Sequence, residues 1–196
     1  MTFRTRLVLI LVASIAAIGI PAVLYEMRVR DVHASTSPPA ILDKMELAEG
    51  TPAAPAITFY DAEGKALSLD DFRGRYVLVN LWATWCGPCI NELPSLVRLQ
   101  ARLPQDQITV LPLDLEKHDA QKVAEFLERT KIEGLPIFID RDFSAMRGFA
   151  ANELPLTILI DSEGREVARA AGEQQWDHAD SIAYLKAVSS PAPSGS

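Results

Sequence analysis

The feature that most constrains the fold is an apolar run that ends just before the only two cysteines of the chain. The run is "RYVLVNLWA", Arg75 to Ala83, and its nearly continuous apolar character is typical of a β-strand covered on both faces. Cys86 and Cys89 follow in "TWCGPC", and a helix is predicted from Cys86 to about Leu103. The cysteine pair is therefore expected at a strand-to-helix junction.

Further strands and helices alternate along the rest of the chain. The predicted strands are "AITFYD", "ITVLPLDL", "PIFID", "LTILID" and "REVARAAG", the last two joined by the hairpin turn "DSEG". The predicted helices are "DAQKVAEFLERT", a piece around Phe143 to Phe149, and His178 to Val188. This order predicts an α/β fold with a mixed central sheet and helices on both of its faces.

An uncharged apolar segment, Leu7 to Tyr25, precedes the domain. It is long enough to cross a hydrocarbon core of about 30 Å, and the short leading tail favours a cytoplasmic N-terminus with the rest exported. The alternative is a cleaved signal peptide, because "VHA", Val32 to Ala34, resembles a small-residue cleavage site. Either interpretation places the domain outside the cytoplasm.

The chain is expected to divide into five parts. These are a cytoplasmic N-terminus at 1–6, a transmembrane anchor or uncleaved signal at 7–25, a linker at 26–49, the α/β domain at 50–188, and a disordered tail at 189–196. A short helix is predicted in the last part of the linker, "AILDKMELAEG". The net charge is −7 and no cluster of lysine and arginine is present, which disfavours nucleic acid as a partner.

Two closely spaced cysteines have three chemical uses. A structural zinc site needs four Cys or His ligands, and the three histidines (His33, His118 and His178) are not at ligand spacing. A structural disulfide across two residues removes little entropy from the unfolded chain. A redox pair fits the position best, because a helix N-terminus lowers the pKa of Cys86 and leaves Cys89 to resolve a mixed disulfide.

The residues around the pair carry a family resemblance. "WCGPC" after "VLVNLWAT" resembles a thioredoxin-fold active site, and "VLVNLWATWCGPCINELP" is similar to the membrane-anchored, extracytoplasmic TlpA/ResA-like thiol–disulfide oxidoreductases. The lead-in "GTPAAPAITFYDAEGKALSLDDFRGRYVLVN" and the closing "ELPLTILIDSEGREVARAAG" agree, so the resemblance spans about Gly50 to Val188. It implies a thioredoxin-like fold preceded by one transmembrane helix, and no cofactor besides the redox-active disulfide.

Glu92 lies one helical turn after Cys89. Ordinary thioredoxins resemble this segment, but they have a buried aspartate on the strand where this chain has Asn80. The TlpA/ResA-like proteins resemble the chain in both features. We therefore interpret Glu92 as the proton acceptor and donor for Cys89, with its pKa raised by partial burial. A purely structural role of Glu92 is the alternative.

The same resemblance identifies the expected substrate-binding residues. It places Pro155 in the cis-proline loop that packs against the cysteine pair, and it leaves the backbone of Leu154 free to pair with an extended substrate. Trp85 beside the first cysteine is expected to form an apolar docking face. The expected substrate-binding residues are Trp85, Gly87, Pro88, Leu154 and Pro155.

The resemblance implies a protein thiol–disulfide oxidoreductase. Gly87 and Pro88 form the dipeptide of reducing thioredoxins, which favours a reductant. The apolar N-terminal segment and the resemblance imply a location in the inner membrane with the catalytic domain in the periplasm. The implied electron donor is a membrane thiol transporter of the DsbD/CcdA type. The implied clients are proteins with cysteine pairs, either apocytochrome c or the copper-site proteins of cytochrome oxidase. A disulfide-forming oxidase and a redox-inactive peptide-binding module remain open, because the exchange direction depends on the reduction potential.

Overall fold

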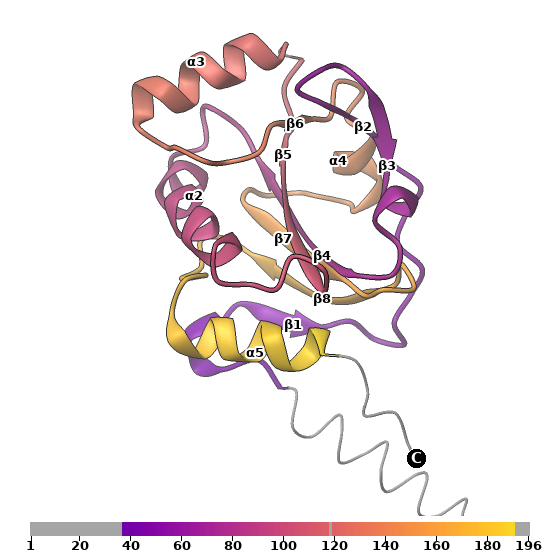
Figure 1. The fold of residues 1–196 in the computed structure, drawn as a ribbon. Coiled ribbons are helices and arrows are strands. Elements are labelled where there is room, and N and C mark those ends of the chain that lie inside the picture. Colours follow the sequence, from indigo (N-terminus) through magenta and orange to yellow (C-terminus); the bar gives the residue numbers. More distant parts are fainter. Residues whose placement is uncertain (1–36, 118, 191–196) are drawn as a thin grey trace, which may run out of the picture. The chain divides into compact units, whose positions relative to one another are not determined.

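The computed structural model describes residues 37–117 and 119–190 (Figure 1). The expected N-terminal tail at 1–6, the anchor at 7–25 and the tail beyond residue 190 lie outside the described residues. Within the two described ranges, no helix has the length and apolar character needed to cross a membrane.

The described residues form eight strands and four α-helices. The strands are β1 (Met45–Leu47), β2 (Thr58–Asp61), β3 (Ala66–Ser68), β4 (Tyr76–Trp82), β5 (Ile108–Asp114), β6 (Phe138–Ile139), β7 (Leu156–Ile160) and β8 (Glu166–Ala171). The helices are α2 (Gly87–Gln100), α3 (Ala120–Thr130), α4 (Ser144–Gly148) and α5 (Ala179–Ser189), with 3₁₀ turns η1 (Ala40–Leu42) and η2 (Leu69–Phe72). The order predicted from the apolar periodicity, from β4 to α5, is confirmed.

All the strands join one sheet with the order β1-β8-β7-β4-β5-β6-β2-β3. β4 pairs in parallel with β5, and β5 with β6, whereas β7, β8, β1, β2 and β3 join in antiparallel orientation. The central strand β4 therefore has a partner on each side, which explains its apolar sequence. The predicted mixed α/β sheet of the thioredoxin-like fold is confirmed.

The two faces of the sheet bury two separate apolar clusters. Leu78 and Trp82 of β4 pack in the cluster that includes residues of α2, α3 and α5. Val77, Val79 and Leu81 of the same strand pack in the cluster that includes α4 and η2. Helices therefore cover both faces, as predicted, and Figure 1 shows α2 and α4 on opposite sides of β4.

This alternation also places one polar side chain. Asn80 lies between Leu78 and Trp82 in the two-residue period of β4, so it points toward the face that α2 covers. Asn80 is fully buried there. The strand thus brings an amide under the helix that carries the cysteine pair.

The expected domain boundary at residue 50 is wrong. The compact unit begins at Pro38, and "AILDKMELAEG" forms η1 and the edge strand β1 instead of the predicted short helix. β1 pairs with β8, with Met45 opposite Ala170, while Leu42 and Met45 are buried. A three-residue strand is too short to show alternation, and its position depends on the free edge that β8 offers.

Candidate active site at the Cys86–Cys89 disulfide

The cysteine pair lies where β4 turns into α2. Cys86 is the N-cap of the helix, and its Sγ accepts a hydrogen bond from the backbone N–H of Cys89 at 3.3 Å. Pro88 lies in the first turn, where a missing N–H removes no helical hydrogen bond. The two sulfurs form a disulfide of 2.03 Å. The junction predicted from the apolar run is therefore confirmed.

The local electrostatics favour negative charge on the first sulfur. The backbone N–H of Cys89 in the first turn of α2 donates to Cys86 Sγ, and the helix dipole adds a partial positive charge at the same end. A thiolate at Cys86 in the reduced protein is stabilised by both. Cys86 retains 5% exposure whereas Cys89 has none, so Cys86 is the sulfur that a partner reaches first.

Glu92 belongs to the buried stripe of α2. The stripe repeats at helical spacing through Cys89, Glu92, Leu96 and Leu99, and the carboxyl side chain is 1% exposed. Glu92 and Cys89 are three residues apart and therefore lie on the same face of the helix. The burial of Glu92 is more complete than the partial burial expected from the sequence.

Three donors hold the buried carboxyl group. Asn80 Nδ2 donates to Glu92 Oε1 at 2.7 Å, while the Gln174 backbone N–H and Trp176 Nε1 donate to Oε2 at 3.0 and 3.1 Å. Burial raises the pKa of Glu92 to about 7, against the lowering effect of these three hydrogen bonds. A carboxyl group with this pKa can gain and lose a proton near neutral pH.

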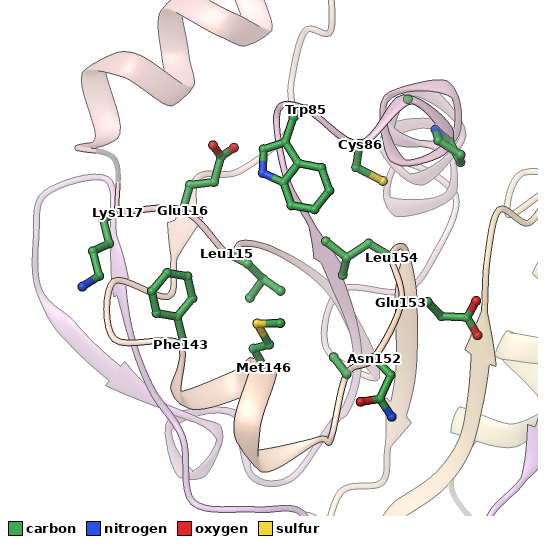
Figure 2. Close-up of a pocket in the computed structure, with 13 residues that line it drawn as sticks. Trp85, Cys86, Leu115, Glu116, Lys117, Phe143, Met146, Asn152, Glu153 and Leu154 are labelled. Atoms are coloured by element: carbon green, nitrogen blue, oxygen red, sulfur yellow. The ribbon is translucent and has the colours of Figure 1, made fainter.

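The Leu154–Pro155 peptide bond is cis, as predicted. Pro155 directly precedes β7, and its carbonyl oxygen accepts a hydrogen bond from the Gly172 N–H at 2.7 Å. Figure 2 shows Leu154 next to Cys86, although the two residues are far apart in the sequence. The start of β7 therefore forms one side of the cysteine site.

A cavity of about 840 Å³ opens beside Cys86. Figure 2 shows Leu115 and Met146 in its middle, with Trp85 and Leu154 near the sulfur. Of the predicted substrate-binding residues, the cavity is lined by Trp85, Gly87, Pro88 and Leu154. Pro155 does not line it. Trp85 is 72% exposed, in agreement with a docking role for its ring.

Several residues of the site were not among the predicted site residues. Phe143 and Met146 reach the cavity from the segment around α4, and Trp176 reaches Glu92 from the loop before α5. Their positions depend on the packing of segments that are far apart in the sequence, which no local sequence pattern predicts. Asp114, the last residue of β5, does not line the cavity, although burial and the charge of Glu116 raise its pKa to about 8.

Residues 37–117 and 119–190 contain no group of three or more His, Cys, Asp or Glu side chains that could hold a metal ion. The reactive element of the described site is the cysteine pair itself. Its chemistry is the exchange of one disulfide for another.

Comparison with known proteins assigns the chain to a family. The AhpC/TSA family matches residues 51–169. The thiol-disulfide oxidoreductase ResA of Bacillus thuringiensis subsp. konkukian (strain 97-27) is 30% identical over 146 residues, 74% of this chain and 80% of that protein. ResA of Bacillus subtilis (strain 168) is 27% identical over 129 residues, 66% of this chain and 70% of that protein.

Solved structures have the same fold. A putative thiol-disulfide oxidoreductase from Bacteroides vulgatus superposes with a TM-score of 0.60 at 29% identity and covers 73% of this chain and 97% of its own. StoA from Bacillus subtilis superposes with a TM-score of 0.56 at 22% identity and covers 67% and 99%. The chain therefore belongs to the AhpC/TSA family and, within it, to the TlpA/ResA-like thiol–disulfide oxidoreductases of thioredoxin-like fold.

Proposed function

We propose that this enzyme reduces disulfides of exported client proteins through the Cys86–Cys89 dithiol. The observation that carries the proposal is the position of the pair. Cys86 caps a helix N-terminus at the edge of an apolar cavity, and a buried carboxyl group with a pKa of about 7 lies one turn beyond Cys89. The arrangement supplies a stabilised thiolate, a surface for a client and a group that exchanges protons.

The reduction consists of two exchanges. The Cys86 thiolate attacks one sulfur of the client disulfide, which forms a mixed disulfide and releases the other client sulfur as a thiolate. Cys89 then attacks the Cys86 sulfur, which forms the Cys86–Cys89 disulfide and releases the second client thiolate. The client gains two electrons and the enzyme loses two. A separate reductant must return the enzyme to its dithiol form.

Glu92 is proposed to accept the proton of Cys89. The Cys89 thiol is fully buried and must become a thiolate before it attacks Cys86. The carboxylate of Glu92, on the same helix face, takes the proton and becomes a neutral acid. In the return reaction the acid gives the proton back to the Cys89 thiolate.

The client is proposed to lie across the cavity as an extended segment. Trp85 and Leu154 flank Cys86, so a peptide whose sulfur reaches Cys86 must pass between them. The backbone of Leu154 then pairs with the peptide, as in other cases of strand addition. Neither the cysteine pair nor this docking requires a metal or an organic cofactor.

The proposed location is the inner membrane, with residues 7–25 as a single-pass anchor and the domain in the periplasm. The apolar N-terminal segment and the family resemblance support it. The proposed donor is a DsbD/CcdA-type thiol transporter, and the proposed clients are apocytochrome c or copper-site proteins of cytochrome oxidase. Protease treatment of spheroplasts tests the orientation. The protease reaches only the outer face of the inner membrane of intact spheroplasts, so a periplasmic domain must be digested without lysis.

The central experiment traps the mixed disulfide. A Cys89→Ser enzyme cannot resolve the bond from Cys86 to its client, so disulfide-linked complexes accumulate and their partners are identified by mass spectrometry. The matched control is Cys86→Ser, which retains the other cysteine but lacks the attacking sulfur. Complexes in neither variant, or equally in both, would contradict the proposed exchange.

The direction of exchange is tested by the reduction potential. A reductant is expected to equilibrate well below the roughly −120 mV of the strong oxidant DsbA. A potential near that value would make the enzyme a disulfide-forming oxidase. Full function in the Cys86→Ser variant would instead indicate a redox-inactive peptide-binding module.

A further inference from the structure

The two oxygens of the Glu92 carboxyl group have chemically different partners. Oε2 accepts from the indole N–H of Trp176 and from the backbone N–H of Gln174. Both of these groups can only donate. A proton placed on Oε2 would therefore point at the hydrogens of these two donors. Oε2 is therefore expected to remain the unprotonated oxygen of the carboxyl group.

Oε1 faces a partner that can both donate and accept. Asn80 Nδ2 donates to Oε1 at 2.7 Å and to Thr157 Oγ1 at 2.9 Å. The Asn80 Oδ1 atom is buried and has no hydrogen-bond partner among the described residues. Turning the amide by 180° exchanges these two atoms. Oδ1 would then accept from a protonated Glu92 and from the hydroxyl of Thr157, which can donate as well as accept.

We propose that Glu92 takes up and releases its proton at Oε1. Asn80 forms a hydrogen bond with Oε1 in both protonation states of Glu92, because its amide can turn to donate or to accept. Trp176 is the positioning residue that holds Oε2. This inference rests on the proposed proton transfer between Cys89 and Glu92 and specifies how the site performs it. An aspartate at position 80 could not play this part when ionised, because it has no hydrogen to donate.

The loop that carries Trp176 is fixed to α2 independently of Glu92. Arg98 Nε binds Asp177 Oδ2 at 2.6 Å, and Arg102 Nη1 donates to the Asp177 carbonyl oxygen at 3.3 Å. The Trp176 side chain itself is fully buried. The indole therefore has a defined position against α2, which is the property that a positioning residue needs.

The surroundings of Glu92 allow its titration to be isolated. Its direct partners on β4 and in the loop are uncharged, and the cysteines of the oxidised enzyme do not titrate. Glu173, the neighbouring charge in the loop, raises the pKa of Glu92. The charged or titratable groups on or next to α2, β4, β5 and the Trp176 loop around it are Tyr76, Arg98, Arg102, Asp114, Glu173, Asp177 and His178.

The test is a pH titration of the oxidised full-length enzyme by NMR, with the ¹³C signal of the Glu92 carboxyl group as the readout. Trp176→Phe retains the ring but removes the donor to the ionised form. It is expected to raise the Glu92 midpoint by about one pH unit, a tenfold gain in proton affinity. Asn80→Ala is expected to move the midpoint by less than half as much, because Asn80 stabilises both forms.

A second readout comes from the wild-type enzyme. The indole N–H of Trp176 and the side-chain amide of Asn80 must change chemical shift with the Glu92 midpoint, and both changes must vanish in Glu92→Gln. A Trp176→Phe midpoint that is unchanged or lower overturns the positioning role. An Asn80→Ala midpoint raised as far as that of Trp176→Phe, or Asn80 amide signals that do not titrate, overturns the double role of Asn80.

The proposed function fails on a different measurement. If Glu92→Gln exchanges disulfides with the same pH profile as the wild type, Glu92 does not serve Cys89, whatever its titration shows. If that profile changes while the Trp176→Phe midpoint does not, the proton transfer stands and the positioning inference is overturned.

Discussion

Two tryptophans only three residues apart have opposite surroundings. Trp82 is on β4 and 1% exposed, whereas Trp85 follows the strand and is 72% exposed. Large apolar side chains at the surface are informative when they adjoin a reactive group. Trp85 lines the cavity beside Cys86 and, being mostly exposed, contributes little to the folded core, so the proposed docking role can be tested separately from stability.

Replacement of Trp85 by alanine should separate these two roles. We expect the free energy of unfolding to stay within about 0.5 kcal/mol of the wild type, because the ring is mostly solvated. We expect kcat/KM for a protein disulfide to fall about tenfold, as for an aromatic contact in the centre of an interface. The rate with dithiothreitol should be unchanged, and an equal loss with both substrates would contradict the docking role.

At the scale of elements, α4 depends on the rest of the fold. A helix of five residues is too short to be stable alone. The buried carboxylate of Asp140 accepts from the Ser144 and Ala145 N–H groups at 2.8 and 2.9 Å, and Ser144 Oγ donates to the Thr58 carbonyl oxygen at 2.7 Å. These bonds hold the segment that brings Met146 to the cavity.

Asp140→Ala is therefore expected to weaken client binding at a distance. The loss of the hydrogen bonds that Asp140 accepts from the first turn of α4 should reduce the free energy of unfolding by about 1–2 kcal/mol and raise KM for a protein client, with the dithiothreitol rate unchanged. Asp71→Ala is the matched control, since Asp71 caps η2 before the other end of β4. An equal rise of KM in both variants would show a general effect of stability.

The N-terminal edge of the sheet permits a second test at this scale. Leu42 is 1% exposed and packs in the same cluster as residues of α5, whereas Leu47 on β1 is 50% exposed. Leu42→Ala should reduce the free energy of unfolding by about 2–5 kcal/mol, and Leu47→Ala by less than about 0.5 kcal/mol. Urea denaturation measures both. Similar midpoints for the two variants would contradict the boundary at Pro38.

The stability of the whole molecule depends on two buried acids. Burial raises the pKa of Glu92 from 4.5 to about 7 and that of Asp114 from 3.8 to about 8. Between these values the folded state keeps protons that the unfolded state has released, so stability falls as the pH rises through this window. The pKa values of Asp71 and Asp177 are lowered, and their stabilisation is lost only below about pH 4.

The oxidised domain should therefore be most stable at about pH 4, at the lower end of the window in which Glu92 and Asp114 lose their protons in the unfolded chain. The glutamine in Glu92→Gln cannot ionise, so the variant should lack the part of the pH-dependent loss of stability that comes from Glu92. For the cited pKa shift this loss is roughly 3 kcal/mol. The variant should match the wild type near pH 4 and exceed it at pH 8 in chemical denaturation. Parallel curves for the two proteins would contradict the buried, proton-binding state of Glu92.

Much of the fold was predictable because its main signals are local. The apolar run before Cys86 indicates a central strand, the hairpin turn "DSEG" indicates the pairing of β7 with β8, and helical spacing indicates α3 and α5. The segment that forms β1 was not predictable. A three-residue segment is too short to show the alternation of apolar and polar residues that predicts a strand. It becomes a strand because it pairs with the free edge of β8.

The sequence by itself determined the redox pair, its place at a strand-to-helix junction, and the family that uses this arrangement. It also indicated Glu92, because the distance from Cys89 along one helix follows from residue number alone. Only the tertiary structure brought Asn80, Gln174 and Trp176 around that carboxyl group. Their distance along the chain, 12 residues for Asn80 and 84 for Trp176, is unrelated to their distance in space. The proton affinity of a buried group depends on such contacts and on desolvation, and both exist only after the chain has folded.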